Sequence, residues 1–147
     1  MPARLVRISL FLAAAVVVSP GVPIVQDTAS AQQAAYTQDQ AEAGAAVYRE
    51  TCAECHLANL RGSFEAPELS GRSFQASWRG GLVAGLLDLI RETMPPDAPR
   101  TLSEQQVAAV TAYLLRENGV SAAGTPLSLS SPGRVFAAES ASAPRAT

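Results

Sequence analysis

Three stretches of this 147-residue chain carry apolar side chains at helical spacing. The first stretch, residues 37–55, has an apolar stripe made of Ala41, Gly44, Tyr48 and Cys52. Thr37 and Gln40 lie three residues apart, which is the spacing of a capping box at the start of a helix. The pattern therefore predicts a helix that reaches Cys55.

The second predicted helix covers residues 82–94. Its expected apolar face consists of Leu82, Leu86, Leu89 and Ile90. Pro95 and Pro96 follow Met94 and end the helix, because proline removes a backbone donor and clashes with the preceding turn. Met94 is thus expected at the helix end, on a rigid turn.

The third predicted helix covers residues 102–119 and has the clearest signals. Ser103 and Gln106 form a second capping box, and Gly119 ends the helix. The apolar stripe consists of Val107, Val110 and Leu114. No stretch alternates as a strand would, so we expect an all-α fold with three main helices.

A glycine-rich segment, residues 56–81, joins the first two helices and is expected to wrap around something, because small domains rarely contain structureless loops of this length. The core available to such a fold is thin. Its only large rings are those of Tyr48, Phe64, Phe74, Trp78 and Tyr113, if all of them lie inside. A bulky apolar cofactor would supply the missing core.

The two ends of the chain differ from the helical part. Residues 1–31 contain two arginines, an apolar run and a small-residue site, which predicts a secretory signal cleaved before Gln32. The alternative is an uncleaved membrane anchor, although the apolar run is short for a bilayer span. Residues 32–36 would be a short N-terminal tail and residues 37–119 the domain. Residues 120–147 are rich in Ser, Ala and Pro and are predicted to be disordered.

The charge balance excludes few functions. Without the predicted signal, the totals of 11 basic and 13 acidic side chains fall to nine and twelve, and every basic residue is arginine. This weakly acidic balance does not indicate nucleic-acid binding. The predicted export implies an oxidising compartment, which we expect to be a bacterial periplasm.

The chemistry of the chain concentrates in Cys52-Ala53-Glu54-Cys55-His56, which holds both cysteines and the only histidine. Four interpretations compete: a disulfide, a thioredoxin-like pair, a zinc site and covalent haem attachment. A thioredoxin-like pair needs a βαβ context, and a zinc site needs more ligands than two thiols and one imidazole. The C-x-x-C-H pattern in an exported helical protein favours haem attachment.

Haem attachment gives each residue of the motif a role. Cys52 and Cys55 lie at i and i+3, so both thiols can reach the two vinyl groups of one porphyrin, and His56 can ligate the iron. Met94 is the only methionine beyond the signal, and no second histidine exists. By elimination Met94 is the candidate for the second axial ligand, because His/Met ligation occurs in cytochromes. Gap-filling in the core is the alternative for Met94.

On these motifs the chain resembles a class I c-type cytochrome over roughly Gln38 to Asn118, with matching pieces "GAAVYRETCAECH", "APELSG", "TMPP" and "LSEQQVAAVTAYLLRENG". The resemblance implies an all-α fold around one covalent haem c. It also implies that the first and last helices cross at Gly44, Tyr48 and Tyr113. It further implies that the Pro67 carbonyl accepts a hydrogen bond from the ring of His56.

Further expectations concern the cofactor rim and the partners. Trp78, Arg72 and Arg79 are candidate donors to haem propionates; alternatively Trp78 belongs to the core and the arginines are solvated. Residues 77–119 also resemble the cytochromes that accompany quinoprotein dehydrogenases. We therefore expect a periplasmic electron carrier with redox-protein partners, one of which can be such a dehydrogenase. We expect no small-molecule substrate. We expect association with a membrane only if the signal is retained.

Overall fold

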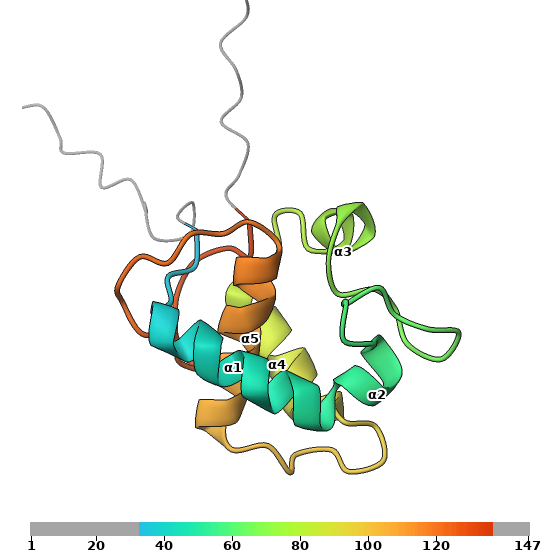
Figure 1. Ribbon diagram of the computed structural model, residues 1–147. Helices are drawn as coiled ribbons and strands as arrows, with labels where there is room; N and C mark the ends of the chain where they lie inside the picture. Colours follow the sequence, from blue (N-terminus) through green and yellow to red (C-terminus); the bar gives the residue numbers. More distant parts are fainter. Residues whose placement is uncertain (1–32, 137–147) are drawn as a thin grey trace, which may run out of the picture.

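The computed structural model describes residues 33–136, which form an all-α fold (Figure 1). Its helices are α1 Gln38–Thr51, α2 Ala53–His56, α3 Arg72–Ser77, α4 Val83–Thr93 and α5 Glu104–Glu117. Within the described range no strand forms. Two isolated β-bridges join Arg134 to Gln33 and to Leu82. The predicted fold class is confirmed. No described helix has both the length and the hydropathy to cross a bilayer.

The predicted helix starts agree closely with the structure. Both capping boxes are present, with Gln40 N–H donating to Thr37 Oγ1 over 3.2 Å and Gln106 N–H to Ser103 Oγ over 3.3 Å. The first predicted helix is divided at Cys52, so that α2 is a separate single turn. The long loop also contains α3, which the sequence pattern did not separate from its surroundings.

The crossing of α1 and α5 is the most extensive contact between helices, and Figure 1 shows α1 lying across α5. Gly44 makes this crossing possible. A Cβ atom at Gly44 would lie only 1.9 Å from the carbonyl oxygen of Ala109, so the two backbones touch there. Beside it the rings of Tyr48 and Tyr113 lie 5.2 Å apart. The crossing implied by the cytochrome resemblance is therefore present.

Two expectations about the core are wrong. Phe64 is fully exposed, at the tip of a loop, instead of filling the interior. Of the predicted apolar face of α4, Leu86 and Ile90 are buried, whereas Leu89 and the capping residue Leu82 are about half exposed. Val83 and Leu87 are completely buried instead. Val83 N–H also donates to the Gly133 carbonyl over 2.9 Å, so residues near 133 pack against the start of this helix and help to bury Val83.

The prediction of disorder from residue 120 onward is wrong for residues 120–136, here called the C-terminal segment. Val120, Leu127 and Val135 are buried in the core. The N-terminal tail is also packed, since the Tyr36 hydroxyl donates to the Val120 carbonyl over 2.6 Å. These buried side chains and long-range hydrogen bonds offset the entropy of ordering the segment. Residues 137–147 and the predicted signal lie outside the described residues.

Candidate functional site

The cysteine–histidine motif lies at the junction of α1 and α2. Cys52 separates the two helices; its N–H donates to the Tyr48 carbonyl over 2.9 Å, and its carbonyl accepts from His56 N–H over 3.0 Å. Both thiols are half-buried, and neither is in a disulfide. The helical turn thus holds two free thiols and one imidazole within five consecutive residues.

The surroundings of Cys52 disfavour its thiolate. Burial raises the pKa of the Cys52 thiol, and the hydroxyl of Thr51, 3.4 Å from the sulfur, opposes this only in part. The nucleophilic cysteines of disulfide oxidoreductases have lowered pKa values instead. This environment therefore argues against the thioredoxin-like interpretation and suits a thiol with a structural or attachment role.

The imidazole of His56 is buried and its orientation is fixed. Its Nδ1 lies 2.8 Å from the carbonyl oxygen of Pro67, so the contact implied by the cytochrome resemblance is present. A carbonyl can only accept, so Nδ1 carries the proton and Nε2 keeps its lone pair. Metal-ligating histidines are oriented by such a bond. His56 is thereby prepared to bind a metal through Nε2.

The loop that carries Pro67 folds back tightly onto α2. Gly62 N–H donates to the His56 carbonyl over 3.0 Å, and Ser63 N–H to the Ala66 carbonyl over 2.8 Å. Gly62 has a φ of +70°, and a Cβ there would lie 2.4 Å from the Ala66 oxygen. Only glycine fits, so this residue makes the close return of Pro67 to His56 possible.

A second contact supports the motif from α1. The Tyr48 hydroxyl donates to the Leu57 carbonyl over 2.7 Å, and Leu57 has a left-handed φ of 61° that costs about 1–3 kcal/mol. Burial is the main reason that the Tyr48 pKa is raised, so its hydroxyl stays a donor. The sequence pattern identified Tyr48 only as a core residue; no local signal links it to Leu57.

Met94 lies at the C-terminal end of α4. Its N–H donates to the Ile90 carbonyl over 3.0 Å, its side chain packs partly buried against the core, and its peptide bond to Pro95 is cis. The turn that follows is tied back to α4, because Arg100 Nε donates to Glu92 Oε2 over 2.6 Å. Met94 thus lies on a braced turn, as the sequence predicted.

The three candidate propionate donors, Trp78, Arg72 and Arg79, differ in their exposure to solvent. Trp78 is half-buried beside α3, with its ring centroid 6.4 Å from that of Phe74. Arg72 and Arg79 are exposed. Within residues 33–136 no three His, Cys, Asp or Glu side chains gather as a metal cluster.

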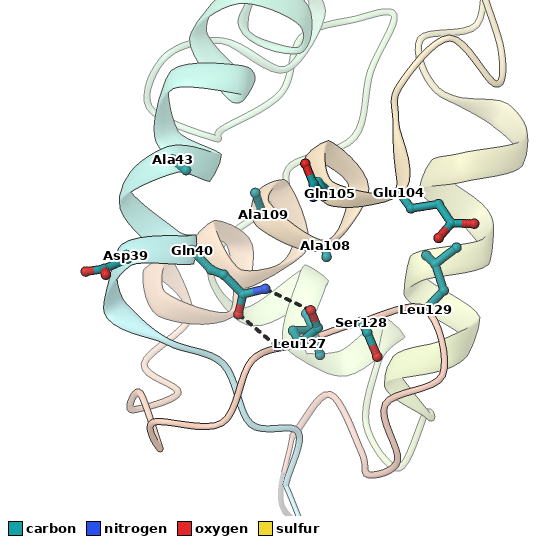
Figure 2. A pocket seen from close by; sticks show the side chains of 10 residues that line it. All are labelled: Asp39, Gln40, Ala43, Glu104, Gln105, Ala108, Ala109, Leu127, Ser128 and Leu129. Carbon is teal, nitrogen blue, oxygen red and sulfur yellow. Dashed lines mark hydrogen bonds between the residues drawn. The ribbon is translucent and has the colours of Figure 1, made fainter.

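A groove of about 420 Å³ lies elsewhere, between the first turns of α1 and α5 and residues 127–129 (Figure 2). Its lining includes Ala43, Ala108 and Leu127, with Asp39 and Glu104 among the polar residues. Gln40 crosses toward the C-terminal segment, and its side chain both donates to and accepts from the Leu127 backbone over 2.8 Å. The groove adjoins the start of α1, whereas the motif follows its end.

These residues fit a haem of the c type. Two unbonded thiols at i and i+3 suit thioether attachment, and His56 offers a lone pair that is oriented by Pro67. Met94 supplies a second soft donor on a separate braced turn. An iron porphyrin is a group that two thiols, one imidazole and one thioether can hold, so these donor types fit it.

No curated protein matches the chain significantly. A solved structure, the "Crystal Structure of the Sulfane Dehydrogenase SoxCD from Paracoccus pantotrophus", matches with a TM-score of 0.48 and 23% identity over 65% of this chain and 56% of that one. The chain thus spans little more than half of that relative.

Residues 39–114, just over half of the chain, match the family described as "Cytochrome C oxidase, cbb3-type, subunit III". The match contains the whole cysteine–histidine motif, Pro67 and Met94. The chain belongs to this family of class I c-type cytochromes, which are haem proteins of electron transfer.

Proposed function

We propose that this cytochrome is a periplasmic carrier that holds one covalent haem c and passes single electrons between redox proteins. Cys52 and Cys55 form the thioethers, His56 is the proximal ligand and Met94 the distal ligand. The observation that carries the proposal is the 2.8 Å contact between His56 Nδ1 and the Pro67 carbonyl, next to two free thiols. It leaves one imidazole nitrogen available and fixes where it points.

The bound haem supplies the one-electron couple, and the chain supplies rigidity and exclusion of water. His56 is held by its backbone, by Pro67 and by the loop around Gly62. Met94 is held by Ile90 and by the Glu92–Arg100 pair across its turn. Ligands that move little between oxidation states keep reorganisation small. Methionine ligation also favours a relatively high potential.

The proposed location follows from the sequence of residues 1–31, which carries a secretory signal pattern with cleavage before Gln32. Mass spectrometry of the mature protein tests it. A chain that begins at Gln32 supports export and release, whereas a chain that keeps residues 1–31 contradicts cleavage and favours a membrane anchor.

The first experiment is a visible spectrum of the protein produced in a host that matures c-type cytochromes. One haem per chain that remains with the denatured polypeptide, by pyridine haemochrome, supports both thioethers. The oxidised spectrum then tests Met94 through its sulfur-to-iron charge-transfer band. Colourless protein contradicts the proposal and returns the motif to a disulfide or metal site.

A subunit role differs from a free carrier only in its partner. Purification of the tagged chain at native expression level separates the two. A monomeric haem protein supports the free carrier. Stoichiometric recovery with a large quinoprotein dehydrogenase subunit contradicts it, and shows the chain to be that enzyme's electron acceptor. A chain with haem but no charge-transfer band indicates instead an open iron site, as in a haem enzyme or sensor.

A further inference from the structure

Asn118 ends α5 and is buried, although its side chain is polar. Its Nδ2 donates to the Leu69 carbonyl and to the Leu114 carbonyl, both over 2.9 Å. Its Oδ1 accepts from Gly71 N–H over 3.1 Å. The amide nitrogen thus faces two carbonyls and the amide oxygen faces one N–H, which fixes the orientation of the side chain. One side chain therefore joins the end of the last helix to a loop that lies 47 to 49 positions earlier in the chain.

This loop is the one that carries Pro67. Leu69 is held in it from two directions, because its N–H donates to the Leu60 carbonyl over 2.8 Å and its carbonyl accepts from Asn118. Pro67 lies two residues before Leu69, inside the loop that the bond to Leu60 closes. The Pro67 carbonyl in turn accepts from the ring of His56 over 2.8 Å. A continuous series of contacts therefore runs from the end of α5 to the imidazole.

Asn118 also has a local role as the cap of α5. Its backbone N–H donates to the carbonyls of Leu114 and Leu115, and its side chain donates to the Leu114 carbonyl as well. These bonds end the helix without any contribution from the loop. The bonds to Leu69 and Gly71 leave the helix and satisfy backbone groups of the loop. Capping alone does not account for these two bonds.

We propose that Asn118 is a positioning residue for the iron ligand, and that it acts through Leu69 and Pro67 on the orientation of His56. This rests on the proposed haem-binding function, in which His56 ligates the iron. The groups that orient a ligating histidine matter to the metal site, because their loss typically costs about 10- to 100-fold in metal affinity or activity. The family match ends at residue 114, so Asn118 lies outside it.

The test uses the single histidine of the chain as its own probe. Full-length haem protein made with isotopically labelled histidine gives one set of ring resonances in the reduced, diamagnetic state. The chemical shift of the His56 Nδ1 proton reports the strength of its hydrogen bond, and its exchange with solvent reports how often that bond opens.

The two variants to compare are Asn118→Leu and Thr111→Val. Thr111 is buried in α5, and its Oγ1 donates to the Val107 carbonyl of the same helix over 2.8 Å. The control therefore removes a buried hydrogen bond from the same helix and leaves the loop untouched. Thermal unfolding of each variant gives a temperature at which all of them are folded, and the ring proton is measured there.

In Asn118→Leu the ring proton is expected to move upfield and to exchange about 3- to 10-fold faster, because the net loss of one hydrogen bond loosens the loop by roughly that factor. Thr111→Val is expected to keep the wild-type chemical shift and exchange rate. Asn118→Asp keeps an acceptor for Gly71 N–H but offers no donor to the Leu69 carbonyl. It is therefore expected to change the ring proton in the same direction as Asn118→Leu.

A role confined to capping predicts a different result. Asn118→Leu would then unfold at a lower temperature and keep the wild-type shift and exchange rate, which overturns the inference. Equal changes of the ring proton in Thr111→Val also overturn it. If Asn118→Leu does not accumulate, Asn118→Asp decides, because it is nearly the same size: a faster-exchanging ring proton supports the inference, and an unchanged one overturns it. Wild-type protein without haem overturns the proposed function itself, which is a separate result.

Discussion

The two proposed axial ligands are held in different ways. His56 lies in a closed network: Pro67 binds its ring over 2.8 Å, Gly62 binds its carbonyl over 3.0 Å, and Tyr48 fixes the next residue. Met94 ends a helix, with one backbone bond to Ile90 and a turn braced at the surface. The side chain of His56 is thus held by a hydrogen bond of its own, whereas Met94 is held through its backbone and the turn that follows it.

This difference predicts that substitutions around His56, the histidine side, and substitutions around Met94, the methionine side, will have different effects on the haem protein. Loss of a residue on the histidine side should reduce the amount of haem protein that forms. Loss on the methionine side should leave the haem attached and change its spectrum and potential. Four substitutions test this comparison.

The largest effect is expected for His56→Ala, because no other histidine exists to replace it. Haem yield should fall by more than the roughly 10- to 100-fold that loss of a supporting group costs a metal site. Haem staining of denaturing gels, normalised to protein, measures it. Asn59→Ala, an exposed change three residues after His56, should keep its haem. A normal yield from His56→Ala would contradict the assignment of the two sides.

The next effect is expected for Met94→Ala. The haem should remain attached, the charge-transfer band should disappear, and the potential should fall by a sizeable part of the roughly 0.8 V that axial ligands span. Redox titration followed optically measures the fall. Pro96→Ala, an exposed change in the same turn, is the matched control. Retention of the band in Met94→Ala would remove Met94 from the iron.

A smaller effect is expected for Tyr48→Phe, which removes the 2.7 Å bond to Leu57 and keeps the ring. The free energy of unfolding should fall by about 1 kcal/mol. Because the Tyr48 pKa is raised, its contribution is present below the ordinary tyrosine pKa of about 10 and is lost as pH rises through the folded value.

Denaturant unfolding at neutral and alkaline pH measures both changes. Tyr113→Phe is the control, because its hydroxyl has no hydrogen bond among residues 33–136. Equal losses in the two variants would mean that the bond to Leu57 contributes nothing to the histidine side.

The smallest effect is expected for Glu92→Gln on the methionine side. The hydrogen bond from Arg100 is the main reason that the Glu92 pKa is lowered. Its contribution is therefore present above the ordinary glutamate pKa of about 4.3 and is lost as pH falls through the lower folded value. Thermal midpoints of wild type and variant should differ slightly at pH 7 and converge in acid. A constant difference at all pH values would exclude this ion pair.

Local signals were enough to predict much of the molecule from its sequence. The capping residues Thr37 and Ser103 fix where α1 and α5 begin, and the proline pair fixes where α4 ends. The contact of His56 with Pro67 was expected from the resemblance, and the structure contains it. All of these depend on short-range chemistry or on a motif that the family shares.

Long-range packing could not be predicted in the same way. Val120, Leu127 and Val135 are isolated apolar residues in a polar stretch, with no period that marks them as buried. Their partners are residues 33–36 and 80–83, far away in the chain. The same contacts bury Val83 in place of Leu82, which explains the error in the predicted face of α4.

The contact of Gly44 with Ala109 also makes the cysteine–histidine motif depend on a helix far along the chain. A 14-residue helix alone is marginal in water, so α1 needs the backbone surface of α5 to stay ordered. In the unfolded chain Cys52 and Cys55 are open to modification, and we expect the closure of α5 onto α1 to limit that exposure.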